Sequence, residues 1–284
     1  RRQRQMCIRD SFKVPRKIAR VRAIEYMDSP GLFSPENLPI DYVISPEQII
    51  TQHIRRLLEH PGATHVLDFA EGRVRLASVR AVKGGPMVQH TVRELHEHMP
   101  NFHARIAAIF RNGEPIVPRG STVILDGDEV FFIASAEEIK GVMSELRKSE
   151  KPYKRLIFAG GGHVGKRVAL ALEDDYQVKV IESDPIRAKK IASQLGNTTV
   201  LVGKASNKNL LSEEGIETTD VFCALTNNDE TNILSAMLAK RLGARRVISL
   251  VNNDAYAQLV DPSQVDLVIS PQQSTISALL RYIR

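Results

Sequence analysis

Two patterns of apolar and polar residues alternate along the second half of the chain. Short apolar runs predict strands at residues 155–159, 177–181, 199–202, 221–225 and 247–251. Apolar residues spaced three or four positions apart predict helices between them, at residues 163–173, 185–195, 209–214 and 229–242. Strands that are apolar throughout and alternate with helices are typical of a parallel sheet with helices on both faces. Residues 153–284 are therefore predicted to form a doubly wound, Rossmann-like α/β domain.

A different pattern precedes this domain. Strands are predicted at residues 74–82, 104–110 and 130–134, and amphipathic helices at residues 91–98 and 136–148. Turn sequences such as Asn112-Gly113 separate these elements. The pattern predicts a small α+β domain over residues 63–149, followed by a polar linker at residues 150–154.

An eight-residue pattern occurs twice, once near each end of the chain. Asp-Tyr-Val-Ile-Ser-Pro-Glu-Gln begins at Asp41, and Asp-Leu-Val-Ile-Ser-Pro-Gln-Gln begins at Asp266. Each copy follows a basic and apolar strand and precedes a segment with helical spacing. A match of this length predicts an internal duplication with a long period. Residues 1–62 are then expected to be the C-terminal remnant of a first Rossmann-like copy, whose glycine turn is missing.

The duplication also implies that the chain is a fragment. We expect it to lack the start of the first copy and whatever followed the second. Residues 1–10 fit neither the strand nor the helix of the repeat, so we expect them to be an artefact of sequence assembly or of the gene model.

The basic charge of the chain is concentrated at one end. Residues 1–22 carry nine Lys or Arg against one Asp, a net +8, whereas the whole chain has a net charge of +6. A basic excess confined to one end does not favour nucleic-acid binding. No apolar run approaches the roughly 18 to 20 residues of a membrane-spanning helix, so we expect a soluble protein. Two cysteines, Cys7 and Cys223, indicate a reducing compartment, and Cys223 is expected to be buried.

A glycine-rich turn follows the predicted strand at residues 155–159. Gly160, Gly162 and Gly165 have the spacing G-x-G-x-x-G between a strand and a helix. In dinucleotide-binding folds the first glycine permits a tight turn and the second lets the backbone approach a pyrophosphate. The third lets the helix pack closely against the strand. The turn therefore predicts a nucleotide site, although glycines required only for packing would give the same pattern.

Neighbouring residues complete this predicted site. The backbone amides of His163 and Val164, at the helix N-terminus, would bind negative charge. Glu182 ends the next strand, where it would accept hydrogen bonds from ribose hydroxyls and repel a 2′-phosphate. This favours NAD or an adenine nucleotide over NADP. The His163 side chain is better explained as a solvated cap residue than as a ligand. Lys204 is equally explained as a surface lysine or as a nucleotide contact.

The sequence offers no convincing catalytic or metal-binding set. Eight histidines are scattered along the chain without metal-ligand spacing, and most are expected to be solvated. Residues 226–232 follow the fourth predicted strand, at the edge where ligands of such sheets bind, but they also suit a loop with a helix cap. An NAD-dependent oxidoreductase would require a positioned acid or base and a larger substrate domain. We therefore expect no catalytic residues and no metal site.

Several stretches resemble a known family. They are ARVRAIEY, DYVISPEQ, HVLDFAEGRVRLASVRAVKGGP, PxGSTVxxxGDEVFFIA from Pro118, MSELRKSEKPYKR, GGGHVG, VFCALTNNDETNILSAMLAKR and ISPQQSTISALL. Together they cover nearly all of residues 11–284. The chain resembles the TrkA family, the peripheral regulatory subunits of Trk potassium-uptake systems. These subunits contain RCK (or KTN) domains, each with a Rossmann-like half and a small α+β half.

The resemblance implies a cytoplasmic ring protein, a homotetramer, on the inner face of the plasma membrane. It would dock on a potassium-translocating subunit of the TrkH or TrkG type and convert binding of NAD(H), or of ATP or ADP, into gating. It places pyrophosphate contacts at 160–164, the ribose contact at Glu182 and further contacts at Thr226 and Asn227, while Arg20 matches a nucleotide-contacting arginine of the first copy. The resulting candidate cofactor-binding residues are Gly160, Gly161, Gly162, His163, Val164, Gly165, Glu182, Lys204, Ala205, Thr226, Asn227 and Arg20.

One position departs from the family pattern. The family has Gly-Asp-Ala where this chain has Gly203-Lys204-Ala205, so the charge near the expected adenosine pocket is reversed. The alternatives to a Trk regulatory subunit are an NAD-dependent oxidoreductase and an RCK-type regulator of another ion transporter, such as an antiporter.

Overall fold

The computed structural model describes most of the 284-residue chain. The described residues are 16–21, 26, 31–33, 37–38, 40–98, 103–147 and 151–283. The expectations for residues 1–10 and Cys7 lie outside them.

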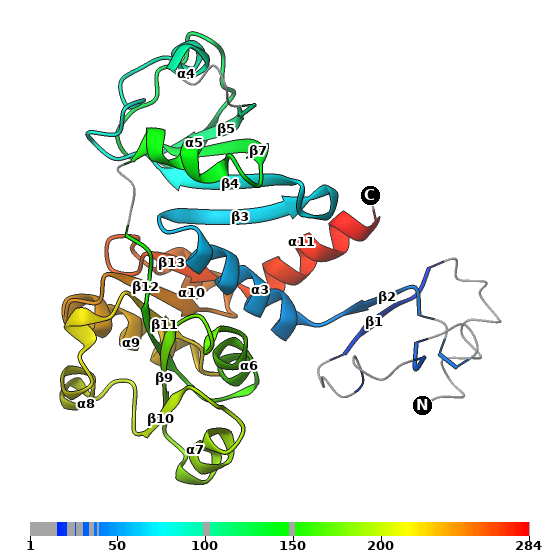
Figure 1. Cartoon of the computed structure of the whole chain (residues 1–284), viewed down its shortest axis with the longest axis vertical. Helices are drawn as coiled ribbons and strands as arrows, with labels where there is room; N and C mark the ends of the chain where they lie inside the picture. The colour runs from blue at the N-terminus through cyan, green and yellow to red at the C-terminus, as the bar shows by residue number, and fades with distance from the viewer. Residues whose placement is uncertain are drawn as a thin grey trace.

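Six parallel strands form the sheet at the centre of the C-terminal half (Figure 1). Their order across the sheet is β10-β9-β8-β11-β12-β13, which is the strand order of a doubly wound Rossmann sheet. The strands are β8 (Arg155–Ala159), β9 (Gln177–Glu182), β10 (Thr199–Val202), β11 (Val221–Ala224), β12 (Arg246–Leu250) and β13 (Leu267–Ile269). Both β11 and β12 are buried along their whole length, as the uniformly apolar runs predicted.

Helices connect these strands and cover the sheet. They are α6 (His163–Leu172), α7 (Pro185–Ala192), α8 (Lys208–Glu213), α9 (Asp229–Arg241), α10 (Asp254–Leu259) and α11 (Pro271–Ile283), with a short 3₁₀ helix at Ile216–Thr218. The predicted α/β fold of this half is confirmed, with element ends that differ from the predicted ones by up to three residues. Cys223 lies in β11 and is fully buried, which raises the pKa of its thiol to about 12.

The middle of the chain forms a five-stranded antiparallel sheet with the order β3-β4-β7-β5-β6. Its strands are β3 (Ala63–Phe69), β4 (Val74–Arg80), β5 (Arg105–Arg111), β6 (Glu114–Ile116) and β7 (Glu129–Ser135). Two helices, α4 (Val92–His98) and α5 (Ile139–Leu146), and a 3₁₀ turn at Ala70–Gly72 accompany them. The α+β prediction is confirmed, but β3 and β6 were not predicted.

Two local predictions for this region were wrong. The helix expected at 136–148 begins only at Ile139, because Glu138 accepts hydrogen bonds from Ser135 Oγ and the His103 amide in the preceding turn. The 150–154 linker is not wholly polar and exposed, since Tyr153 is buried. His60 is an exception to the expectation that most histidines are solvated, because it is buried between α3 (Pro46–Glu59) and the antiparallel sheet.

The internal duplication is visible in the backbone. Strands β1 (Ile18–Arg20) and β2 (Tyr42–Ile44) form a parallel pair, and α3 follows. Strands β12 and β13 pair in the same direction, and α11 follows. The amide of Gln48 donates to Ser45 Oγ at the start of α3, and the amide of Gln273 donates to Ser270 Oγ at the start of α11. The repeated Ser-Pro-x-Gln sequence thus specifies the same helix cap twice.

Helix α3 does not lie over its own strand pair. It packs against α6, on the large parallel sheet, and beside α11 (Figure 1). Ile50, Ile54, Leu57 and Leu58 are almost completely buried on one face of α3, and each contributes roughly 1.5 to 3 kcal/mol of apolar burial. Tyr42 stacks on Tyr282 of α11, with 4.3 Å between the ring centroids. The two copies are therefore interleaved through their terminal helices.

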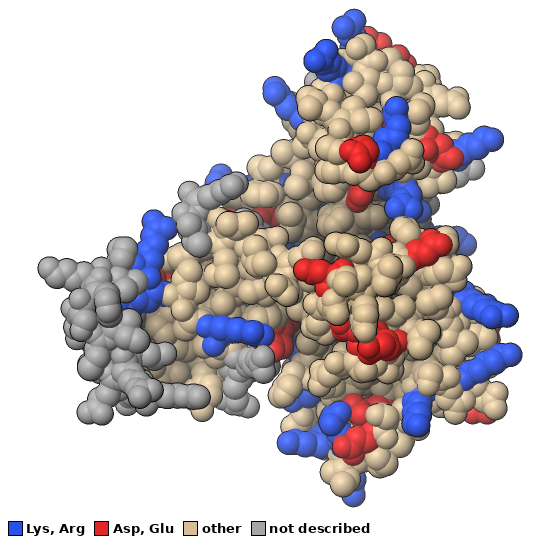
Figure 2. All heavy atoms as spheres, turned by 180° about the vertical axis from the view of Figure 1, so that it is seen from behind, with Lys and Arg blue, Asp and Glu red and all other residues tan. Residues whose placement is uncertain are grey.

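The contact between the antiparallel sheet and the parallel sheet includes a buried arginine. Arg246 of β12 donates hydrogen bonds to the carbonyl oxygen of Ala63 and to the hydroxyl of Tyr153. Arg245 lies over the Tyr153 ring, 5.0 Å from its centroid. On the face shown in Figure 2, Lys and Arg side chains are scattered among Asp and Glu.

Candidate nucleotide site

A cavity of about 490 Å³ lies at the carboxyl ends of β8, β9, β10 and β11. Strand β8 is the point where the strand order reverses, because its neighbours are β9 on one side and β11 on the other. Ligands of open α/β sheets bind at such switch points, and this volume is within the usual range for small-molecule sites. The lining residues are Gly160, Gly162, Ile181, Glu182, Ser183, Arg187, Gly203, Lys204, Ala205, Ser206, Leu225, Thr226, Asn227, Asn228 and Thr231.

The glycine turn forms one wall of the cavity. Gly160 has φ +103°, a conformation that side chains disfavour, and a Cβ there would lie 3.0 Å from the Thr226 amide nitrogen. At Gly165 a Cβ would collide with the carbonyl oxygen of Gly160, so this glycine serves close packing of α6. Gly162 differs, because a Cβ there would meet no atom within 4 Å although the residue lines the cavity. The space beside Gly162 is therefore available to a ligand.

The N-terminus of α6 points toward this turn. Gly162 occupies its cap position, and no side chain of the described residues caps the helix. The side chain of His163 is exposed and Val164 is half-buried, and neither lines the cavity. Free amides at a helix N-terminus carry partial positive charge and suit a phosphate group.

Glu182 is buried beneath the turn. Its Oε2 accepts a hydrogen bond from the Gly161 amide at 2.9 Å, and its Oε1 accepts one from the Asp184 amide at 2.9 Å. Burial acts to raise the pKa of the carboxyl group, but the Asp184 and Gly161 amides, together with the charge of Arg187, hold the pKa below its usual value. Glu182 is therefore ionised near neutral pH. It fixes the glycine turn against the end of β9.

The opposite wall is formed by the loop after β11. Asn232 is fully buried, and its Oδ1 accepts hydrogen bonds from the amide (2.9 Å) and the hydroxyl (2.6 Å) of Thr226. Its Nδ2 donates to the carbonyl oxygens of Thr226 at 2.9 Å and Leu250 at 2.8 Å. Asn228 caps α9 by accepting from the Thr231 amide. The loop is thus both a cavity wall and a helix cap, which the sequence had left as alternatives.

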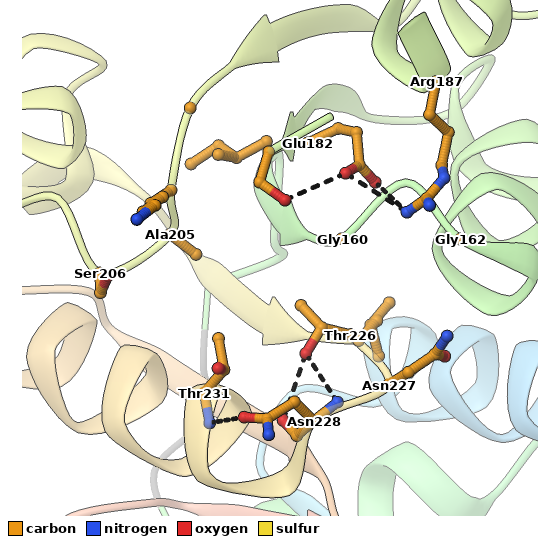
Figure 3. Close-up of a pocket in the computed structure, with 15 residues that line it drawn as sticks. Gly160, Gly162, Glu182, Arg187, Ala205, Ser206, Thr226, Asn227, Asn228 and Thr231 are labelled. Atoms are coloured by element: carbon orange, nitrogen blue, oxygen red, sulfur yellow. Dashed lines mark hydrogen bonds and ion pairs between the residues drawn. The ribbon is translucent and has the colours of Figure 1, made fainter. Parts of the chain in front are cut away.

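The structure brings most of the expected residues together (Figure 3). Gly160, Gly162, Glu182, Lys204, Ala205, Thr226 and Asn227 line one cavity. Four other expected residues do not line the cavity and instead form the turn and the start of α6: Gly161, His163, Val164 and Gly165. Arg20 lies elsewhere, on β1 of the separate two-stranded pair. Two residues that shape the site were not among the predicted contacts: Arg187, whose guanidinium lies beside Glu182, and Asn232, which fixes Thr226.

Comparisons with known proteins match both folded halves of the chain. The TrkA-N domain family matches residues 156–271, and the TrkA-C domain family matches residues 76–147. The chain is 52% identical over 273 residues to the Trk system potassium uptake protein TrkA of Halomonas elongata, and 49% identical over 274 residues to that of Vibrio alginolyticus. Both domains of the TrkA family, TrkA-N and TrkA-C, are therefore present in this chain. Each alignment covers 96% of this chain but 60% of the relative.

Solved structures share the fold over almost the whole chain. The GsuK channel matches with a TM-score of 0.62 and 17% identity, covering 93% of this chain and 45% of that one. A GsuK channel bound to NAD matches with a TM-score of 0.59 at 17% identity over the same fractions of the two chains. Across the part of the chain that the structure describes, no helix is both long and apolar enough to cross a membrane.

Proposed function

We propose that this chain is the nucleotide-sensing part of a regulatory subunit of a Trk-type potassium-uptake system, with a regulatory rather than an enzymatic role. The observation that carries the proposal is the open space beside Gly162, in a cavity at the switch point of a TrkA-N sheet. The names of the TrkA relatives support the link to potassium uptake.

The proposed ligand is NAD(H), with ATP or ADP as the alternative. The backbone at Gly160 and Gly162 and the N-terminus of α6 would hold the phosphates. Glu182 would accept ribose hydroxyls, and Thr226 and Asn227 would contact the ligand from the opposite wall. A protein of the same fold is described as bound to NAD, which favours the dinucleotide. When bound, the nucleotide supplies negative charge and a rigid bridge between the two walls.

The nucleotide would act by favouring one arrangement of a ring of subunits. We infer that each chain has three domains, at residues 1–62, 63–149 and 153–284, and that the chains form a homotetramer. The ring would be cytoplasmic and peripheral, docked on a membrane subunit of the TrkH or TrkG type. A ligand shifts such an equilibrium only if its affinity differs between the two arrangements. The helices that follow Thr226 and Ser270 would carry this difference to neighbouring subunits.

The test is calorimetric titration of NADH, NAD, ATP and ADP into the full 284-residue chain. Glu182→Gln removes the charge that would accept hydrogen bonds from the ribose hydroxyls. Glu213→Gln removes a charge from an exposed position outside the cavity. We expect NADH to bind the chain and the Glu213→Gln variant equally, and to bind Glu182→Gln at least tenfold more weakly. Circular dichroism checks that both variants are folded.

Two results would contradict the proposal. If none of the four nucleotides binds the folded chain, the cavity is not a nucleotide site. If Glu182→Gln and Glu213→Gln bind NADH with the same affinity, the ribose does not hydrogen-bond to Glu182 at the end of β9. Oxidation of NADH by added carbonyl compounds would instead favour an oxidoreductase.

A further inference from the structure

The carboxylate of Glu182 is surrounded by donors. Besides the Gly161 and Asp184 amides, Ser183 Oγ donates to Oε1 at 3.3 Å, and only 3% of the residue is exposed. Repulsion of a 2′-phosphate would require this carboxylate to face the ligand without compensation. The sequence-based preference for NAD over NADP depended on that assumption.

Arg187 lies at the same end of the cavity (Figure 3). The side chain of Asp184 caps α7 by accepting from the amides of Ile186 and Arg187, which fixes the backbone of Arg187 near the end of β9. The Nη1 atom of Arg187 lies 3.4 Å from Oε2 and 3.5 Å from Oε1 of Glu182. These distances exceed the 2.7 to 2.9 Å of strong charge-assisted hydrogen bonds, and the Arg187 side chain is 51% exposed. The guanidinium is therefore held loosely and can turn toward a ligand.

The charges lining the cavity do not exclude a further phosphate. The charged lining residues are Glu182, Arg187 and Lys204, a net charge of +1. The negative charge of Glu182 is balanced by the hydrogen bonds from the two amides and by the charge of Arg187. Lys204, in contrast, is exposed on the loop after β10. In dinucleotide-binding folds an arginine near the ribose accommodates a 2′-phosphate, because the planar guanidinium donates two parallel hydrogen bonds to phosphate oxygens.

We propose that Arg187, assisted by Lys204, forms a subsite for a 2′-phosphate, so that the cavity accepts NADP(H) as well as NAD(H). This inference depends on the proposed nucleotide site. Arg187 would leave Glu182 when the dinucleotide binds, the ribose 3′-hydroxyl would take its place at the carboxylate, and the guanidinium would pair with the phosphate. Adenosine ligands without the phosphate would not use Arg187 in this way.

The test compares NADH with NADPH by calorimetry on the full chain and three variants. Arg187→Met removes the charge and keeps much of the side-chain length, and Arg187→Lys keeps the charge without the fork. Lys190→Met is the matched control, since Lys190 is exposed on α7 and lies outside the cavity lining. We expect NADPH to bind the unmodified chain within about tenfold of NADH. Arg187→Met should weaken NADPH roughly 10- to 100-fold and NADH less than about threefold, as expected for a charged hydrogen bond.

Intermediate NADPH binding by Arg187→Lys and unchanged binding by Lys190→Met would support the subsite. An unmodified chain that binds NADH but not NADPH would overturn this inference and leave the proposed function intact. Equal weakening of both dinucleotides by Arg187→Met would also overturn it, because Arg187 would then act on the shared part of the ligand. Binding of neither dinucleotide would overturn both proposals.

Discussion

Replacement of Asn232 should loosen the cavity wall at Thr226. The four hydrogen bonds of this fully buried amide join the loop after β11 to the end of β12. In Asn232→Ala the Thr226 amide and the carbonyls of Thr226 and Leu250 lose these bonds, while the Thr226 hydroxyl retains the Asn228 carbonyl at 3.2 Å. At about 1 kcal/mol for each of the three backbone groups, the free energy of unfolding should fall by roughly 3 kcal/mol.

Asn232→Asp provides a sharper version of the same experiment. One carboxylate oxygen would still accept from Thr226, but the other would face the carbonyl oxygens of Thr226 and Leu250, where Nδ2 now donates. Repulsion and buried charge should therefore make Asn232→Asp at least as destabilising as Asn232→Ala. Asn209→Ala, on the exposed face of α8, is the control and should change stability by less than about 0.5 kcal/mol.

Two measurements together test this reasoning. Urea unfolding followed by circular dichroism gives the global effect, and hydrogen exchange of peptides spanning 221–235 gives the local one. A loss of about 3 kcal/mol corresponds to roughly 100-fold faster exchange of the Thr226 amide if local opening carries the change. NADH affinity should fall in parallel, because the wall is no longer fixed. An effect of Asn232→Ala no larger than that of Asn209→Ala would refute the reasoning.

Three further outcomes are expected. Gly162→Ala should leave the midpoint of thermal unfolding nearly unchanged, because no protein atom lies near the added Cβ, but should weaken NADH binding at least tenfold by calorimetry. Gly165→Ala should instead lower the unfolding midpoint clearly, because the added Cβ meets the Gly160 carbonyl oxygen; a harmless Gly165→Ala would contradict the observed packing. Glu129 is partly buried, which acts to raise its pKa, but hydrogen bonds from His65, Thr64 and Ser78 lower that pKa to about 2. Its stabilising contribution should be complete above pH 4.5 and lost as the pH falls toward 2, so the stability difference between the chain and Glu129→Gln should shrink in urea unfolding over that range.

Much of the fold follows from the order of residue types along the chain. Buried parallel strands must be apolar on both faces, so β8 to β12 appear as short apolar runs between helices. The glycine spacing after β8 is readable because the backbone there needs residues without a Cβ. The repeated Ser-Pro-x-Gln sequence marks two helix starts, because capping is a local interaction within four residues. The strands β3 and β6 escaped prediction, since both are edge strands and β6 contains Pro115.

The site was only partly determined by the sequence. Glu182 could be assigned from its place at the end of β9, but its burial and its bonds to the Gly161 and Asp184 amides depend on how the glycine turn folds back over the sheet. Arg187 lies beside Glu182 only because the Asp184 cap starts α7 at that position. Asn232 acts across 18 residues on Leu250, a distance at which sequence spacing carries no information. The sequence by itself determined the fold class, the duplication and the location of the turn, because these depend on local preference and periodic burial. The tertiary structure decided which charges face one another in the cavity, because such contacts join residues that only the packed chain brings together.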